Sequence, residues 1–485
     1  MFYILFFILY LQLSFTQDPF DGYTLFNPLT EGPSGGGENY SRLIDNNGNI
    51  INQWSHHTCA ATAPYLLPDS TLICPFKVVN PSMYGSAYGG EIVHYNWSGD
   101  IIWEYEYSGE NHLQHHDIEP LPNGNILIVS WDRKTYLEVL DSGREDVEGE
   151  MWPDKIVELQ PIGLDSANIV WEWCFWDHII QDTNPNLPNY GVISDHPELI
   201  DINIGEMPML ALGYADWTHI NSIDYNEEFD QIILSSRNLN EIYVIDHSTT
   251  TEEASGHTGG NSGMGGDILY RWGNPMNYGR GTVEDKMFIG QHDANWIEDG
   301  YPGAGNIIIF NNGATSGFGG GYGVQSSIIE ITPPVDSEGN YSANAVDPFG
   351  PLIPTWSFVS NSFSPFMSGT RRLPNGNTLI TVATELAIFE IAPNGHIVWE
   401  YNHTDPGYSS ISKSFKYSLD YFNSEGALGD PNNDSNIDIF DLIIIINFIL
   451  ELDFPNEFQA NQADINQDGF ITVDDIVMLL NIILS

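Results

Sequence analysis

The chain has 485 residues, which suits a β-propeller of six to eight blades at about 40 to 50 residues each, with room for one small extra module. Aromatic residues make up 13% of it and glycines number 46, which favours many short strands and tight turns. Its 14 Lys and Arg against 66 Asp and Glu give a formal net charge of −52, so no nucleic-acid partner is expected, because phosphate binding needs a basic face.

The chain begins with MFYILFFILYLQLSFTQ, whose apolar run of about 14 positions is typical of a signal-peptide core and short for a membrane span. We therefore expect a signal peptide over residues 1–17 and a secreted, periplasmic or cell-surface protein. No Lys or Arg precedes the apolar core, so an uncleaved N-terminal anchor is the alternative.

Two repeated units predict the architecture. A turn-plus-strand unit, Leu-Pro-Asn-Gly-Asn-x-Leu-Ile, occurs at residues 121–128 and 373–380, with looser versions at 67–74, 226–234 and 303–310. The second unit is a hairpin of two apolar runs that ends in Trp, found at residues 90–105 and 386–401 and less completely at 167–173 and 266–272. Alternating hairpins are what four-stranded propeller blades require, because each blade buries its faces against its neighbours.

We therefore predict an all-β fold, a six-bladed β-propeller over residues 18–403, with seven blades as the second choice. Residues 181–215 and 247–265 are too long and too polar to be hairpin turns. We expect them to be surface insertions that rim one mouth of the ring.

Cysteine usage argues against a disulfide scaffold. The three cysteines, Cys59, Cys74 and Cys174, allow at most one intramolecular disulfide. Cys59 with Cys74 is the expected pair if the chain is oxidised.

Histidine recurs at one position relative to the repeated strand. His116 precedes the strand unit in HHDIEPLPNGN, and His219 and His292 hold comparable positions before their own strands, with slightly longer loops. Repeat symmetry would direct all three toward the central axis, where they can surround one ligand. His115 stands directly before His116, so these two could exchange roles, and we include His115 as a substrate-binding candidate.

Two arginines are candidates for holding an anion, which an acidic protein must bind through a few local cations. Arg237, in IILSSRN, lies just beyond the strand that follows His219, and a guanidinium can bind a tetrahedral oxyanion through two hydrogen bonds. Arg371, beside Arg372, occupies a nearby blade entrance and is a substrate-binding candidate. Three axial histidines could also bind a transition metal, but the charge of Arg237 would oppose a nearby cation.

After an expected linker over residues 404–428, the pattern becomes helical and predicts a calcium-binding module over residues 429–485. It contains two twelve-residue loops, DPNNDSNIDIFD at 430–441 and DINQDGFITVDD at 464–475. Oxygen-bearing side chains recur at loop positions 1, 3, 5 and 12, as a hard cation such as Ca²⁺ requires. With the position-7 residues included, the candidate Ca²⁺ ligands are Asp430, Asn432, Asp434, Asn436, Asp441, Asp464, Asn466, Asp468, Phe470 and Asp475.

The segments HHDIEPLPNGN, DWTHINSIDYN, ILSSRN and QHDANW, in this order, resemble those of the bacterial arylsulfate sulfotransferases. The resemblance covers residues 40 to 403 and implies a six-bladed propeller with its active site in the central channel. It implies that His292 is the nucleophile that becomes sulfated, while His116, His219 and Arg237 bind the sulfuryl group and assist proton transfer. It also implies an aryl sulfate donor and a phenolic acceptor, with no nucleotide donor or metal in the propeller.

The paired C-terminal loops resemble a type I dockerin, in which one helix follows each loop and position 12 is Asp. This resemblance implies Ca²⁺-dependent folding and docking to a cohesin-like receptor. Two rival functions remain open at this point: a non-catalytic ligand-binding propeller displayed through its dockerin, and a sulfate ester hydrolase in which water replaces the phenol.

Overall fold

The computed structural model describes residues 18–30, 38–205, 215–313, 325–342, 346–419, 421–423, 428–432, 437–450, 452, 455, 457–466 and 469–484. The predicted signal peptide and the candidate Ca²⁺ ligands Asp434, Asn436 and Asp468 lie outside these residues. Within the described ranges, no helix has both the length and the apolar character needed to cross a membrane.

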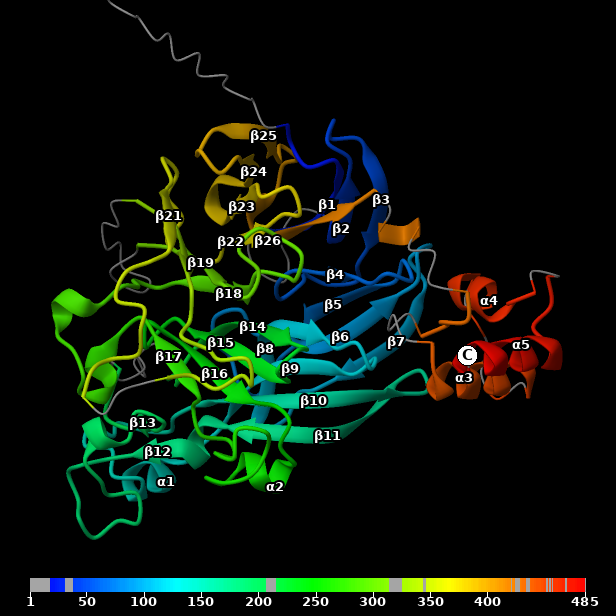
Figure 1. The fold of residues 1–485 in the computed structure, drawn as a ribbon. Coiled ribbons are helices and arrows are strands. Elements are labelled where there is room, and N and C mark those ends of the chain that lie inside the picture. Colours follow the sequence, from blue (N-terminus) through cyan, green and yellow to red (C-terminus); the bar gives the residue numbers. More distant parts are fainter. Residues whose placement is uncertain are drawn as a thin grey trace, which may run out of the picture.

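Six four-stranded antiparallel sheets form a β-propeller, which confirms the predicted fold (Figure 1). Blade 1 contains β1 (Gly22–Thr30), β2 (Tyr40–Ile44), β3 (Ile50–Ser55) and β26 (Tyr408–Ser418). Blade 2 contains β4 (Tyr65–Leu66), β5 (Leu72–Lys77), β6 (Gly90–Tyr95) and β7 (Ile101–Glu106). Blade 3 contains β8 (His112–Pro120), β9 (Ile126–Asp132), β10 (Asp154–Ile162) and β11 (Ser166–Cys174).

The remaining blades follow in chain order. Blade 4 contains β14 (Ile220–Asn226), β15 (Gln231–Ser236), β16 (Glu241–Asp246) and β17 (Tyr270–Trp272). Blade 5 contains β18 (His292–Trp296), β19 (Ile307–Asn311), β20 (Ser327–Ile331) and β21 (Trp356–Val359). Blade 6 contains β22 (Gly369–Arg372), β23 (Thr378–Val382), β24 (Ala387–Ile391) and β25 (Ile397–Asn402).

Short helices and one small ribbon occupy the connections. The helices are α1 (Tyr136–Asp141), η1 (Phe175–His178), η2 (Ile193–Asp195), α2 (Thr251–Ala254), η4 (Pro275–Tyr278), η5 (Val283–Asp285), η6 (Ala383–Glu385) and η7 (Tyr421–Asn423). The ribbon pairs β12 (Ile179–Ile180) with β13 (Ile200–Asp201) in parallel. The two predicted insertions therefore have structure of their own: the first carries β13 of the ribbon and η2, and the second carries α2.

The ring closes where β26 pairs antiparallel with β1, which corrects the predicted domain boundary. Residues 408–418 fall in the expected linker over 404–428, so the propeller continues beyond residue 403. The Ser- and Lys-rich sequence of this strand suggests a linker, but the first strand of a blade directs polar groups into the interior of the ring. Lys413, for example, is buried, and its Nζ lies 2.7 Å from an Asp117 oxygen on β8.

The Leu-Pro-Asn-Gly-Asn units form the tight turns that the sequence predicts. In blade 3 the Leu121 amide donates to the Asn125 carbonyl at 2.8 Å, and in blade 6 the Leu373 amide donates to Asn377 at 2.9 Å. Each turn passes through a glycine with a positive φ, 83° at Gly124 and 86° at Gly376, a conformation that other residues rarely adopt. These turns fix the first strand of each blade against the second.

Apolar side chains of adjacent blades form the core. The cluster between blades 3 and 4 includes the buried rings of Trp171, Trp173 and Tyr243. Cys59 and Cys74 lie together in another apolar cluster. All three cysteines are free thiols, so the Cys59–Cys74 disulfide expected for an oxidised chain is not formed.

An ion-paired histidine joins blades 3 and 4 and should make stability depend on pH. His247 Nδ1 lies 2.7 Å from Asp230 and its Nε2 lies 3.1 Å from Glu158. Burial opposes protonation, but the two carboxylates outweigh it and raise the pKa of His247 to about 9. The pair therefore stabilises the fold fully below pH ~6.5, and this contribution, at most about 3 kcal/mol, is lost as the pH rises through about 9.

We expect His247→Gln to lower the free energy of unfolding at pH 6 by about 2 kcal/mol and much less at pH 10, since the wild-type imidazole is neutral there. Denaturant unfolding at both pH values measures this difference. A loss of equal size at the two pH values would contradict it.

Beyond the propeller, the C-terminal region is helical, as predicted. It contains α3 (Ile439–Ile449), α4 (Glu457–Ala463) and α5 (Val473–Ile483), which pack around Ile445, Phe448 and Leu479. Capping boxes start α3 and α5, with Asp438 and Thr472 as the N-caps. In each box the reciprocal carboxylate belongs to loop position 12, Asp441 or Asp475.

Candidate active site

A small cavity lies among the first strands of the blades and brings together residues that are far apart in the chain. Its volume is about 30 Å³, room for roughly two waters. The residues that line it are Thr62, Ala87, His116, Asp117, Asn221, His292, Asp293, Met367, Ser368, Ser412 and Lys413. The ring of His219 reaches the same place, because its centroid lies 4.5 Å from that of His116.

Each of the three predicted histidines lies at or beside a bulge in the first strand of its blade. The strand register shifts between Gln114 and Ile118, between Ile220 and Ser222, and between His292 and Asn295. The backbone is left-handed at His116 and His219, each with φ of 50°, whereas in blade 5 it is Asp293, with φ of 53°, that adopts this conformation. The three histidine positions are therefore related, but His292 lies one residue earlier than His116 and His219 relative to the left-handed residue of its strand. Such unfavourable backbone angles are often retained at functional sites.

His116 and His115 take different places. His115 is fully buried and stacks on Trp131 with ring centroids 4.3 Å apart, while His116 lines the cavity. His115 Nε2 lies 2.6 Å from an Asp154 oxygen, and its Nδ1 lies 2.7 Å from His116 Nδ1. If both rings are neutral and Asp154 is ionised, His116 Nδ1 donates to His115 Nδ1, and His115 Nε2 donates to Asp154. His116 Nε2 then carries a lone pair.

His219 and His292 are oriented by chemically different partners. His219 Nδ1 is hydrogen-bonded to a carboxylate oxygen of Asp216. His292 Nδ1 lies 2.8 Å from the amide oxygen of Asn312 and 3.0 Å from the Gly290 carbonyl, both acceptors, so this nitrogen carries the proton. His292 Nε2 consequently has a lone pair, which accepts the Met367 amide at 3.1 Å.

Electrostatics keep two of the three imidazoles neutral. Burial and the nearby Arg237 cation lower the pKa of His292 to about 3. Burial and the His219 ring lower the pKa of His116 well below its usual value. Burial disfavours an ionised Asp216, but His219 outweighs it and keeps the pKa of this carboxyl below its usual range. The site thus combines neutral imidazoles, a fixed cation and one carboxylate-bound histidine.

Arg371 contacts protein carboxylates. Its guanidinium lies 3.1 Å from an Asp293 oxygen and 3.9 Å from Asp224, and Lys413 lies 3.4 Å from Asp293. Burial opposes its charge, yet these carboxylates raise the pKa of Arg371. Arg371 does not line the cavity, so its role in substrate binding stays a prediction without geometric support.

The groups that orient the histidines were missed by the sequence analysis. Asp216 lies three residues before His219 in DWTH, a local signal that could have been read. Asp154 and Asn312 come from other strands or their ends, and Met367 from another blade entrance. The hydrogen bonds between these residues and the histidines depend on tertiary structure, which no local sequence pattern encodes.

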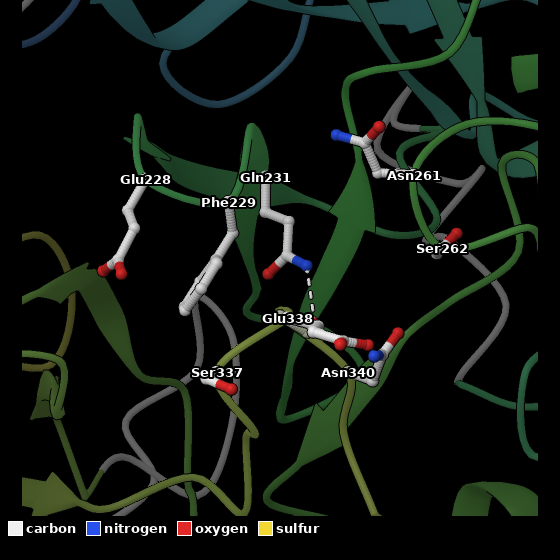
Figure 2. A pocket seen from close by; sticks show the side chains of 9 residues that line it. Glu228, Phe229, Gln231, Asn261, Ser262, Ser337, Glu338 and Asn340 are labelled. Carbon is white, nitrogen blue, oxygen red and sulfur yellow. Dashed lines mark hydrogen bonds between the residues drawn. The ribbon is translucent and has the colours of Figure 1, made fainter.

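A larger hollow of about 250 Å³ lies elsewhere, between the β14–β15 turn, the loop after α2 and the turn at residues 337–340 (Figure 2). Gln231 Nε2 donates to the Gly339 carbonyl at 2.8 Å across its floor. Glu228 and Glu338 are the charged side chains among its described lining residues. A hollow with two carboxylates does not suit an anionic substrate, so the histidine cavity remains the candidate site.

Comparisons with known proteins bear on both parts of the chain. A sequence model described as Arylsulfotransferase (ASST) matches residues 33–421, and one described as Dockerin type I domain matches residues 428–484. No curated protein matches the chain.

Solved structures that match are distant. A protein of unknown function from Bacteroides caccae is 9% identical, with a TM-score of 0.42 over 81% of this chain and 98% of that chain. The periplasmic gluconolactonase PpgL of Pseudomonas aeruginosa is 12% identical, with a TM-score of 0.38 over 82% and 99% of the two chains. Apo AztD from Citrobacter koseri is 7% identical, with a TM-score of 0.36 over 82% and 98%. At these scores the solved structures indicate no function for this chain.

Proposed function

The chain belongs to the arylsulfotransferase family over residues 33–421 and ends in a type I dockerin domain, and from this premise we propose a reaction and a mechanism. The protein moves a sulfuryl group from an aryl sulfate ester to a phenolic acceptor, through a sulfohistidine on His292 and without a nucleotide donor. The observation that carries the proposal is the neutral His292, which lines the cavity, has its proton held on Nδ1 by Asn312, and has the Arg237 cation near enough to lower its pKa.

In the first step, His292 Nε2 forms a bond to sulfur while the bond from sulfur to the aryl oxygen breaks. The incoming sulfur must replace the Met367 amide at the Nε2 lone pair, after which that N–H is free to bind a sulfuryl oxygen. Arg237 supplies positive charge toward the same oxygens. The low pKa of His292 keeps its lone pair available from pH 4 upward.

His219 is the proposed acid and base. Its Nδ1 is held by the Asp216 carboxylate, which leaves Nε2 to exchange a proton, whereas the Nδ1 of His292 is held by the neutral amide of Asn312. His219 gives its proton to the departing phenolate. In the second step it takes the proton of the incoming phenol, whose oxygen bonds to sulfur as the sulfur–nitrogen bond breaks.

His115 is proposed to position His116 through the chain that starts at Asp154. When His115 carries a second proton, the hydrogen bond between the rings reverses and His116 Nε2 becomes a donor. Asn221 also lines the cavity, and its side-chain oxygen has no hydrogen-bond partner among the described residues, so it can accept the phenol hydroxyl.

The test is incubation of the purified protein with p-nitrophenyl sulfate, with and without added phenol. Transfer predicts nitrophenol release that rises with the phenol concentration and produces phenyl sulfate. Release that ignores phenol would support the sulfate ester hydrolase, and absence of release would support the ligand-binding propeller.

Asp216→Asn should separate the proton-transfer role from folding. We expect sulfuryl transfer from phenyl sulfate to fall by roughly 10²- to 10³-fold, and transfer from p-nitrophenyl sulfate to fall much less, because p-nitrophenolate leaves without a proton. Asp230→Asn, which alters a His–Asp pair outside the cavity, is the matched control and should retain activity. Equal losses with both donors would argue against His219 as the acid.

The C-terminal domain is proposed to bind Ca²⁺ and a cohesin-like receptor, which places the protein outside the cytoplasm or on the cell surface. Residues 428–485 contain no Lys, Arg or His, yet Asp430, Asp441 and Asp475 are at most 1% exposed. Buried carboxylates in a module without basic residues fit a hard cation. The ligands that would hold it are the loop residues named from the sequence, and bound Ca²⁺ supplies their missing positive charge.

A further inference from the structure

A second set of histidines lies outside the active-site cavity, where blades 3 and 4 meet. His178 ends η1, directly after blade 3, while His257 and Asp267 belong to the segment between α2 and β17 of blade 4. His178 Nδ1 lies 2.9 Å and His257 Nδ1 lies 2.7 Å from the same Asp267 oxygen. In the described part of the chain, this is the group of three metal-binding side chains whose ligand atoms all lie within 4.8 Å of one another.

The hydrogen bonds of His178 orient its ring so that Nδ1 points toward Asp267. His178 Nε2 lies 2.9 Å from the Ala254 carbonyl, which can only accept, so this nitrogen carries the proton. Nδ1 then faces the Asp267 carboxylate at 2.9 Å, and either a second ring proton or a metal cation can join the two groups. Metal-binding histidines typically donate their other ring nitrogen to a backbone carbonyl, as His178 does here.

The surroundings hold His178 and Asp267 in place. His178 is fully buried and stacks on Trp173 at an interplanar angle of 8°. Trp173 Nε1 donates to the Gly266 carbonyl at 2.7 Å, which anchors the residue before Asp267. A Cβ at Gly266 would lie 1.9 Å from the Ala254 oxygen and 2.7 Å from His178 Nε2, so only glycine allows this approach.

One side of the group faces solvent. The His257 side chain is 61% exposed, whereas those of His178 and Asp267 are 0% and 8% exposed. Two ligands are thus fixed by the fold, the third is on the surface, and a water can take a fourth position. Two imidazoles and one carboxylate with an open position form a donor set that suits Zn²⁺.

We propose that His178 Nδ1, His257 Nδ1 and an Asp267 oxygen bind one Zn²⁺ that joins blade 3 to the long insertion of blade 4. The ion neutralises the carboxylate. It also links residue 178 to residues 257 and 267, which are separated from residue 178 in the chain by three strands of blade 4. Its role is structural, because the group shares no residue with the histidine cavity.

The test is calorimetric titration of the full chain with Zn²⁺ in saturating Ca²⁺, which keeps the dockerin loops occupied. We expect one Zn²⁺ bound at micromolar concentration or tighter, and an affinity at least about 100-fold weaker in His257→Ala, since a ligand is lost. His57→Ala is the matched control, because His57 is another exposed histidine paired with one carboxylate, Glu91 at 2.7 Å, and among the described residues no second histidine pairs with Glu91. Zn²⁺ should also raise the Tm of the wild type and not that of His257→Ala.

Three results would overturn the proposal: no Zn²⁺ binding, equal binding by His257→Ala and the wild type, or a site that His292→Ala removes and His257→Ala does not. Because His257 is exposed, its replacement should leave the fold intact, and circular dichroism checks this. A fully folded His257→Ala protein that keeps sulfuryl transfer supports the structural role.

Discussion

Replacement of His292 by alanine is expected to lower the cleavage of p-nitrophenyl sulfate by a factor on the order of 10⁴ or more. The residue supplies the electron pair that attacks sulfur, and no neighbouring group can do so from the same position. His219 is hydrogen-bonded to Asp216. The His116 ring belongs to blade 3, where His115 holds its orientation. A residue that only binds the sulfuryl group would leave partial activity.

His396→Ala is the matched control for this variant, because His396 lies exposed in a turn of blade 6 and should be dispensable. Mass spectrometry of the wild type, quenched with donor and no acceptor, should show one sulfuryl adduct on the peptide that contains His292. The assignment fails if His292→Ala keeps its activity, or if the adduct is on His116 or His219.

The sequence was sufficient to predict the ring and the meeting of its histidines. Repeated turn and hairpin units predict blades, and a residue type that recurs at one position of a repeat must recur at one radius of the ring. His116 and His219 hold the same position, with φ of 50° at each, and their rings meet. His292 is offset by one residue and Arg237 follows a second strand, yet both lie near enough to lower the pKa of His116.

The support for these histidines could not be predicted in the same way. Asp154 starts the third strand of blade 3, whereas Asn312 follows the second strand of blade 5. The two residues therefore hold different positions in the repeat. A hydrogen bond between side chains of different strands depends on register and bulges, which vary by one residue between the blades, as Asp293 shows. Sequence periodicity specifies which face of a strand is buried, but not these offsets.

Ring closure was the other feature that local pattern concealed. Residues 404–428 look like a linker because the repeated strand pattern weakens there and residues 408–418 are rich in Ser and Lys. In the structure these polar groups face the interior, where Lys413 meets Asp117 and Asp293. Arg371 is explained by the same cluster: buried carboxylates require buried cations, so a basic residue in an acidic propeller is not by itself a substrate ligand.

Removal of Ca²⁺ is expected to unfold the C-terminal domain while the propeller stays intact. Asp430, Asp441 and Asp475 are buried, and residues 428–485 contain no basic side chain, so only a bound cation can supply positive charge to these carboxylates from within the domain. The apolar helix α3 begins at the end of the first loop and takes both residues of its capping box, Asp438 and Asp441, from that loop. Loss of the metal should therefore expose the helices to protease.

Limited proteolysis of the full chain, in Ca²⁺ and in excess chelator, measures this. We expect a resistant propeller fragment under both conditions and digestion of residues beyond 428 in the chelator alone, with sulfuryl transfer unchanged. Asp475→Ala should digest in Ca²⁺ as the wild type does in chelator, whereas Asp474→Ala, at the exposed adjacent position, should stay protected. Equal protection of the wild type with and without Ca²⁺, or equal sensitivity of the two variants, would show that buried carboxylates here are not calcium ligands.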